Sequence, residues 1–158
     1  MLSSLSNNQL IEFKSNILKE CKSLVEKKLN NLISSLKEVT ESSNSESKSS
    51  AGDKHETSKA MMQIEQEKLS KQISELKIQK SELEKIIPNI NREKIIRGSL
   101  IETNHGLFFI SEAIGKINIS NKVILAISTH SPIGKEMIDK NGKQFSFNHL
   151  NYEINFIA

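Results

Sequence analysis

Residues 41–56 read Glu-Ser-Ser-Asn-Ser-Glu-Ser-Lys-Ser-Ser-Ala-Gly-Asp-Lys-His-Glu, a serine-rich stretch that ends in an acidic segment. Ser and Asn compete with helix formation by hydrogen-bonding to nearby backbone groups, so this stretch predicts a break. On both sides of it, apolar residues recur at spacings of three, four and seven. Two helices joined by a short polar connector predict an antiparallel hairpin whose turn carries Asp53 and Glu56.

The segment before the break, from about Ser6 to Thr40, has the pattern of one long amphipathic helix, and no Pro or Gly interrupts it. The only cysteine, Cys21, lies in the apolar stripe, which favours buried packing over reactivity. A single cysteine excludes an intrachain disulfide and fits a reducing compartment. The stripe comprises Ile11, Leu18, Val25, Leu32 and Val39, spaced seven apart, with Leu10, Ile17, Cys21, Leu24, Leu29, Ile33 and Leu36.

The segment after the break, from about Thr57 to Ile87, repeats the pattern, and Pro88 is expected to end it because proline lacks an N–H. Gln66 and Lys80 fall in its second column, where polar residues fix the register at some cost in stability. Each helix would be about 45–50 Å long at the helical rise per residue. The seven-residue series comprises Met62, Leu69, Leu76, Leu83 and Ile90.

The two apolar stripes leave a choice of pairing partner. They could pair within one chain, or they could drive dimerisation between chains. Their similar lengths and the short polar connector favour the intrachain antiparallel coiled coil, so we expect a monomer. Self-association through exposed parts of the stripes stays open at this point.

Beyond the second helix the hydrophobic period changes, and stretches rich in Ile, Val and Phe alternate with polar or Gly breaks. Ser131 and Pro132 predict the N-cap and first position of a short helix, and residues 140–143 predict a turn. The chain is therefore predicted to be α+β, with a helical hairpin over 1–90 and a small antiparallel sheet domain with one short helix over 94–158. Strands are expected at 95–103, 106–111, 113–119, 123–128, 144–148 and 150–156.

The composition of the 158 residues excludes several classes of protein. The net charge of +3 is small and evenly spread, which disfavours a nucleic-acid-binding surface. No run approaches the ~18 apolar residues of a membrane span. The stretch from Met1 to Phe13 lacks the basic and apolar regions of a signal peptide. We therefore expect a cytoplasmic protein that does not bind membranes.

Asp53 and Glu56 are the candidate metal ligands, because carboxylates three residues apart at a helix start share one face. Carboxylate oxygens suit Mg²⁺, but two of them would not hold the ion tightly without ligands from a partner. The same Asp-x-x-Glu spacing predicts a capping box with Asp53 as the N-cap, and the cap and ligand roles are compatible. His55 is expected to be a solvated loop residue, with a third ligand or proton donor as the alternative.

The remaining candidates for chemistry are few. His105, His130 and His149 lack the spacing of metal ligands and are expected at surface or turn positions. The sequence has no Gly-rich phosphate loop, no nucleophile elbow and no closely spaced pair of cysteines. No self-contained active site is expected, so a partner would have to complete any chemistry at the acidic segment.

In the order of its elements the chain resembles the Gre transcript-cleavage factors of bacterial RNA polymerase, which have an N-terminal antiparallel coiled coil, an acidic tip and a C-terminal FKBP-like domain. Residues 52–56, Gly-Asp-Lys-His-Glu, are similar to the family's tip, where Gly-Asp is followed by a Glu three residues after the Asp. Residues 127–135, Ile-Ser-Thr-His-Ser-Pro-Ile-Gly-Lys, and 140–145 are similar to the family's Ser-Pro helix followed by a Gly turn and a strand. Residues 98–102 are similar to the first strand of that domain.

The resemblance implies a transcription elongation factor that is not an enzyme by itself. Its coiled coil would enter the secondary channel of RNA polymerase, and its C-terminal domain would dock at the rim. Asp53 and Glu56 would act in trans beside the 3′ end of the nascent RNA, where they would help to hold the polymerase's second Mg²⁺ during hydrolysis of backtracked RNA. The residues that would bind the partner are Ser131, Pro132, Ile133, Gly134 and Lys135.

Two alternatives stay open. The family usually follows the tip Glu with Asn-Ala-Glu-Tyr, whereas this chain has Thr-Ser-Lys-Ala at 57–60. That difference favours a Gre-like regulator that occupies the channel without cleavage activity. The other alternative is a coiled-coil protein-interaction adaptor unrelated to transcription.

Overall fold

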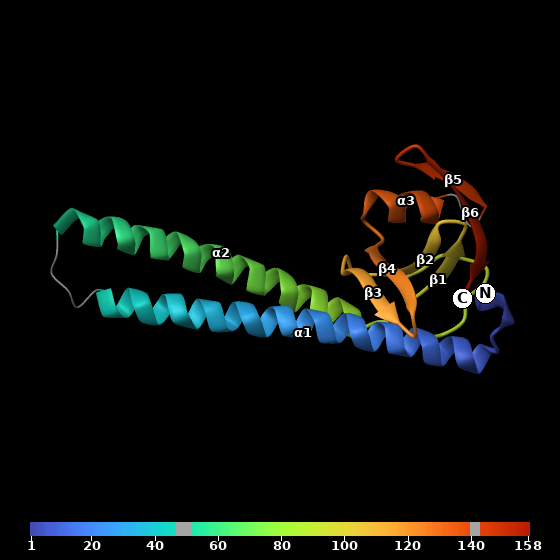
Figure 1. Cartoon of the computed structure of the whole chain (residues 1–158), viewed down its shortest axis with the longest axis horizontal. Coiled ribbons are helices and arrows are strands. Elements are labelled where there is room, and N and C mark those ends of the chain that lie inside the picture. Colours follow the sequence, from blue (N-terminus) through green and yellow to red (C-terminus); the bar gives the residue numbers. More distant parts are fainter. Residues whose placement is uncertain (47–51, 140–142) are drawn as a thin grey trace. The chain divides into compact units, whose positions relative to one another are not determined.

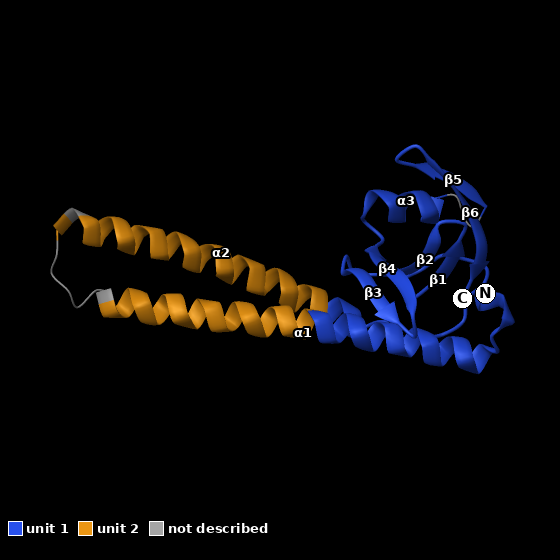
Figure 2. Cartoon of the chain, in the orientation of Figure 1, with its two compact units in different colours: residues 1–24, 81–158 blue, residues 25–80 orange. Residues whose placement is uncertain are grey.

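The computed structural model describes residues 1–46, 52–139 and 143–158, without the side chains of residues 46 and 53. It has two long helices followed by a six-stranded sheet and a short helix, so the predicted α+β class is confirmed (Figure 1). Two compact units are distinguished, residues 25–80 and residues 1–24 with 81–158 (Figure 2). The elements are η1 (Leu2–Ser4), α1 (Asn7–Glu46), α2 (Gly52–Glu84), β1 (Leu100–Thr103), β2 (Gly106–Ser111), β3 (Gly115–Ile119), β4 (Lys122–Ser128), α3 (Pro132–Asp139), β5 (Gln144–Phe147) and β6 (Leu150–Ile157).

The unit of residues 25–80 is an antiparallel pair of helices. Lys80 Nζ lies 2.6 Å from Glu26 Oε2, and Gln66 Nε2 donates to Thr40 Oγ1 at 3.4 Å. Moving fourteen residues forward along α1, from Glu26 to Thr40, therefore moves fourteen residues back along α2, from Lys80 to Gln66. This register confirms the predicted intrachain hairpin, and it places the two polar residues of the second column, Gln66 and Lys80, in contacts between the helices.

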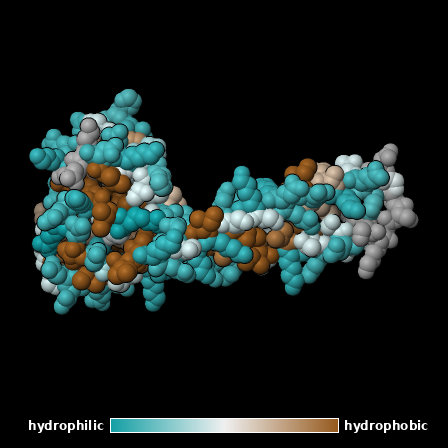
Figure 3. All heavy atoms as spheres, turned by 180° about the vertical axis from the view of Figure 1, so that it is seen from behind, coloured by the Kyte–Doolittle hydropathy of each residue, from teal (hydrophilic) through white to brown (hydrophobic). Residues whose placement is uncertain are grey.

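Burial in this hairpin decreases toward its turn. Val25, Leu29, Leu69 and Ile73 are buried, as the heptad pattern predicts. Near the turn the apolar side chains of α1 and α2 are only half-buried or exposed, and apolar surface is visible along the hairpin (Figure 3). The hairpin is therefore held together mainly by its part distant from the turn.

The helix ends differ from the predicted ones on both sides of the serine-rich break. α1 continues to Glu46 instead of ending near Thr40, and α2 begins at Gly52 instead of Thr57. An existing helix extends at little cost once it is nucleated, even through residues of modest propensity. Ser45 Oγ also donates to the Glu41 carbonyl oxygen at 3.1 Å, which satisfies the hydroxyl within the helix. Residues 47–51 of the predicted break lie outside the described residues.

The sheet has the strand order β3-β4-β2-β1-β6-β5. Among the described strands, neighbours are antiparallel as predicted except for β2 and β4, which run parallel. The parallel pair arises because β3 takes the edge position and β4 returns between β3 and β2. The hairpins β3–β4 and β5–β6 turn at Ser120–Asn121 and Asn148–His149, where all four residues have positive φ, as a type I′ turn requires.

Both faces of the sheet are covered within the unit of residues 1–24 and 81–158. On one face, Met137 of α3 joins a buried cluster that includes Ile101, Phe108, Ile110 and Ile127. On the other, the beginning of α1 runs beside the sheet (Figure 1). There Lys122 Nζ lies 5.5 Å from the centre of the Phe13 ring, and Cys21 of α1 is fully buried. The sequence predicted only α3 against this sheet.

Two predicted strands begin later in the structure. β1 begins at Leu100 instead of residue 95, because Ser99 N donates to the Ile96 carbonyl oxygen at 2.9 Å and forms a turn before the strand. β3 begins at Gly115 instead of residue 113. Residues 140–142 of the predicted turn lie outside the described residues. None of the described helices combines the length and the apolar character that a membrane crossing requires.

Candidate functional site

The acidic segment lies in the first turn of α2, at the turn end of the hairpin. Gly52 has φ of +37°, a conformation that L side chains rarely adopt, and the chain enters the helix from it. Positions 53 and 56 are three apart in a helix and so lie on the same face, and the Glu56 side chain is exposed. Because α2 begins at Gly52, Asp53 lies in the first turn of the helix. The predicted cap and ligand roles of its side chain lie outside the described residues.

His55 differs from the predicted solvated loop residue, since it is helical and half-buried. Its Nδ1 atom is buried and has no hydrogen-bond partner among the described residues. The described side chains contain no group of three or more His, Cys, Asp or Glu that could hold a metal ion.

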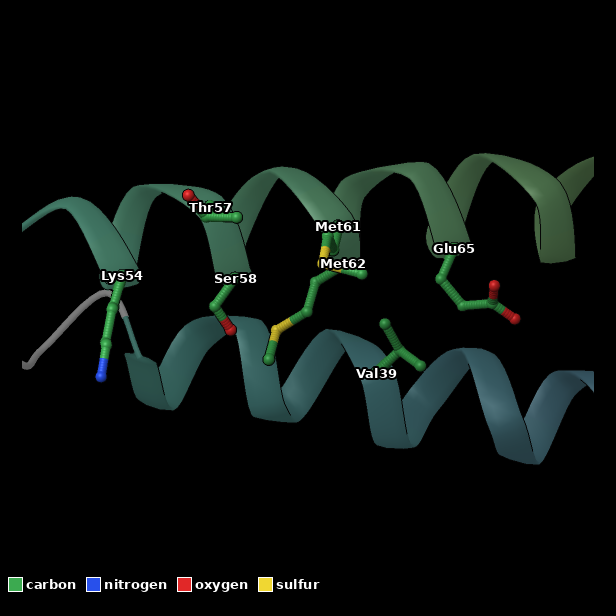
Figure 4. Close-up of a pocket in the computed structure, with 7 residues that line it drawn as sticks. All are labelled: Val39, Lys54, Thr57, Ser58, Met61, Met62 and Glu65. Atoms are coloured by element: carbon green, nitrogen blue, oxygen red, sulfur yellow. The ribbon is translucent and has the colours of Figure 1, made fainter.

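A groove of about 650 Å³ lies between the two helices next to the acidic segment (Figure 4). Val39 of α1 points up into it, and the side chains of Ser58 and Met62 point down from α2 toward α1 (Figure 4). Val39 gives the groove an apolar floor, and the charged residues Lys54 and Glu65 of α2 lie at its two ends. The α2 lining residues are Lys54, Thr57, Ser58, Met61, Met62 and Glu65.

The predicted partner-binding segment forms the start of α3, and Ser131 is its N-cap as predicted. Ser131 Oγ accepts a hydrogen bond from Gly134 N at 3.1 Å and donates to the Ser128 carbonyl oxygen at 2.7 Å. A Cβ atom at position 134 would overlap that carbonyl oxygen, so the close approach requires glycine. Pro132 and Lys135 are exposed, whereas Gly134 is buried.

Lys14 is a buried cation that the sequence reading missed. It is 1% exposed, and its Nζ donates to the Asn89 carbonyl oxygen. Burial lowers the pKa of Lys14 to about 8. The signal was present in the sequence, because Lys14 lies four residues after Leu10 and three before Ile17, both fully buried on α1.

The predicted burial of Cys21 is confirmed. Burial raises the pKa of the Cys21 thiol to about 11, which keeps it protonated and unreactive at neutral pH.

A polar network was not predicted: Arg97 bridges Glu82 Oε2 at 2.8 Å and Glu112 Oε1 at 2.7 Å. Hydrogen bonds from Lys85 and then Arg97 lower the pKa of the Glu82 carboxyl. These contacts join the end of α2 to the loops of the sheet.

The other histidines have the surface or turn positions predicted for them. His105 follows β1, and its Nε2 lies 3.0 Å from the Asn151 carbonyl oxygen while its ring packs edge-on against Tyr152. His149 is a turn residue between β5 and β6, and His130 is exposed. These contacts stabilise the fold.

Comparisons with known proteins do not identify a family. No family model, no curated protein and no solved structure gives a significant match to this chain.

Proposed function

We propose that this chain is a Gre-like transcription elongation factor that binds RNA polymerase through its secondary channel and stimulates cleavage of backtracked RNA. The observation that carries the proposal is the antiparallel hairpin of residues 25–80, with Gly52 to Glu56 in the first turn of its second helix. A carboxylate pair at the turn of a two-helix rod has little to do for its own fold. It is well placed to act on another molecule.

The dimensions of the hairpin suit insertion into a channel. Its α2 part, residues 52–80, is about 44 Å long at the helical rise per residue, and its α1 part, residues 25–46, is about 33 Å. Two packed helices form a rod that is only two helix diameters across. The exposed flanks carry mostly polar and charged side chains, which allows the rod to slide along a solvated passage.

Asp53 and Glu56 would supply oxygen ligands in trans. A bound Mg²⁺ would supply Lewis-acid stabilisation of the phosphate and a lowered pKa for the attacking water. The part of this chain is to place two carboxylates on one helical face and to keep that face rigid through the helix hydrogen bonds of the first turn. Because no third ligand is grouped with Glu56 among the described side chains, the polymerase would provide the remaining ligands.

The start of α3 would contact the rim of the channel. Pro132 and Lys135 are exposed and present one apolar and one cationic group, while Ser131 and Gly134 shape the backbone beneath them. In this proposal Ile133, which is half-buried, packs against the buried cluster of the sheet and holds the segment in place. Docking would therefore depend on the shape of the segment more than on its charge.

A second candidate function is occupancy of the channel without cleavage. The observation that favours it is the exposed Lys59, three residues after Glu56 on the same helix. A cation at that spacing attracts the Glu56 carboxylate and reduces its availability to a metal ion. In that case the chain would regulate initiation or pausing by blocking the channel.

The experiment uses stalled, backtracked elongation complexes made with the cognate polymerase. Purified protein is added with Mg²⁺, and both polymerase binding and the length of labelled RNA are followed. The proposal expects binding together with Mg²⁺-dependent shortening of the RNA. Binding without shortening would support the channel-blocking function, and absence of binding would leave the protein-interaction adaptor.

A further inference from the structure

Val39 and Met62 are the apolar residues nearest the turn that face the opposite helix of the hairpin. Both line the groove beside the turn, and the Met62 side chain points from α2 toward α1 (Figure 4). Closer to the turn, residues 40–46 of α1 and 52–60 of α2 contain no apolar side chain larger than that of alanine. We propose that Met62 is a reversible oxidation site, at which a peroxide converts the thioether to a sulfoxide and thereby loosens the turn end of the hairpin.

The turn end of α2 has few other contacts that could replace the one made by Met62. Counted from the turn, Leu69 is the first residue of α2 that the structure describes as buried, seven residues beyond Met62. Between them, Gln66 Nε2 donates to Thr40 Oγ1 at 3.4 Å, but this hydrogen bond is exposed. Apolar burial at Met62 therefore contributes much of what holds the first turns of α2 against α1.

The groove gives a small oxidant access to the sulfur of Met62. Its volume is about 650 Å³, and Met62 is only half-buried. The sulfur attacks one peroxide oxygen, the O–O bond breaks as the S–O bond forms, and the peroxide leaves as water or an alcohol. The sulfur loses two electrons, which the peroxide gains. The resulting sulfoxide is polar, so it would destabilise an apolar contact, and thiol-dependent methionine sulfoxide reductases reverse the reaction.

Two other methionines provide comparisons within the same chain. Met61 is 67% exposed, so its sulfoxide would remain hydrated and should have little effect on the packing of the helices. Met137 is fully buried in the cluster beneath the sheet, where a peroxide cannot reach it in the folded chain. Among these three side chains, only that of Met62 is both accessible to a peroxide and directed toward a neighbouring helix.

The inference does not depend on the proposed function, because its effect is a change in the local stability of the free chain. If both hold, oxidation of Met62 would loosen the first turn of α2, which carries positions 53 and 56. RNA cleavage would then fall under oxidising conditions. A chain without any cleavage activity would still show the change in local stability.

The test follows amide hydrogen exchange of the full chain before and after treatment with hydrogen peroxide. Peptide masses report which methionine has gained an oxygen atom. In the oxidised wild type, exchange over residues 54–65 should become at least about threefold faster, because local opening requires less free energy. Met62→Gln, which places a polar side chain of similar length at this position, should show the faster exchange without peroxide. Met61→Gln is the matched control and should exchange like the wild type.

Met62→Leu keeps an apolar side chain of similar volume without the sulfur, so it should fold normally and keep slow exchange after peroxide treatment. Reductase treatment of the oxidised wild type should restore slow exchange. Wild-type exchange in Met62→Gln would overturn the proposal. Equal acceleration of Met62→Leu and the wild type by peroxide would also overturn it, because the responsible residue would lie elsewhere. A change that the reductases do not reverse would be damage and would overturn the reversible site.

Discussion

The buried ammonium group of Lys14 donates a hydrogen bond to the main-chain carbonyl oxygen of Asn89. This contact ties the beginning of α1 to the segment that follows α2, within the unit of residues 1–24 and 81–158. The charged side chain of Lys14 occupies a position of α1 at which the helical pattern predicts an apolar residue. The desolvation that results lowers the pKa of Lys14 from 10.5 to about 8.

The lowered pKa of Lys14 predicts a specific dependence of stability on pH. Between about pH 8 and 10.5 the unfolded chain binds this proton while the folded chain has released it. Stability should therefore rise with pH across that window, and the cost of the buried charge should be fully present below pH 8. Urea unfolding at a series of pH values measures this rise.

Lys14→Met isolates the contribution of Lys14. Met fills a similar volume without the charge, and replacing buried ionic groups by apolar residues of similar volume is often neutral or stabilises a protein by about 1–4 kcal/mol. Asn89 is exposed, so its carbonyl oxygen can bond to water in the variant. The variant should be more stable at pH 7 and should lose the rise above pH 8. A variant that is less stable and keeps the wild-type slope would contradict this account.

Gly134→Ala should destabilise the sheet unit. The new methyl group would overlap the Ser128 carbonyl oxygen, and relieving that overlap should cost about 1–3 kcal/mol in the free energy of unfolding. Ser131→Ala, which removes the cap at the same helix, should cost about 0.5–2 kcal/mol. Thermal unfolding followed by near-ultraviolet signals of Tyr152 and the phenylalanines measures both. Equal stability of Gly134→Ala and wild type would show that the segment can relax.

The burial of individual side chains predicts different costs for truncating apolar residues on the two faces of α2. Leu69 is buried, so Leu69→Ala should lower the free energy of unfolding of the hairpin by about 2–5 kcal/mol. Ile78 is 64% exposed, so Ile78→Ala should change it by less than about 0.5 kcal/mol. Amide hydrogen exchange of residues 25–80 reads the local stability directly. Similar losses of protection in the two variants would argue against the packing described.

Much of the fold could be predicted from local patterns. The strand alternation located β2, β4, β5 and β6 to within a residue or two, and Ser131 with Pro132 located the start of α3. The beginning of α1 packs beside the sheet, and its later part packs against α2. This change of packing partner could not be predicted, because one continuous apolar stripe does not indicate where along the helix the partner changes. The parallel β2–β4 pair was missed for a similar reason, since local sequence does not determine which strands become neighbours.

The candidate site was predictable only in part. The spacing of Asp53 and Glu56 indicated a shared helical face, but the start of α2 at Gly52 depends on how far helix extends from its nucleus. Lys14 was overlooked because a lysine in an apolar stripe was read as part of the polar face. The groove beside Met61 and Met62 could not be predicted, because it depends on how the two helices pack near the turn.

The central claim is that the acidic segment acts by lending carboxylates to a metal ion in the polymerase. Glu56→Gln and Asp53→Asn keep nearly the same side-chain shape while removing the charge. Each should lower stability by only about 0.3–1 kcal/mol, through the loss of a favourable charge at a helix N-terminus. Glu75→Gln makes the same change at an exposed position of α2 far along the chain from the turn and serves as the control.

The most direct measurement is the rate of RNA shortening in backtracked elongation complexes saturated with each variant. The account predicts that Asp53→Asn and Glu56→Gln abolish the cleavage that the wild type and Glu75→Gln stimulate, while all four proteins bind the polymerase equally. Cleavage at the wild-type rate by Asp53→Asn and Glu56→Gln would contradict the account and leave both residues with a role only at the start of the helix.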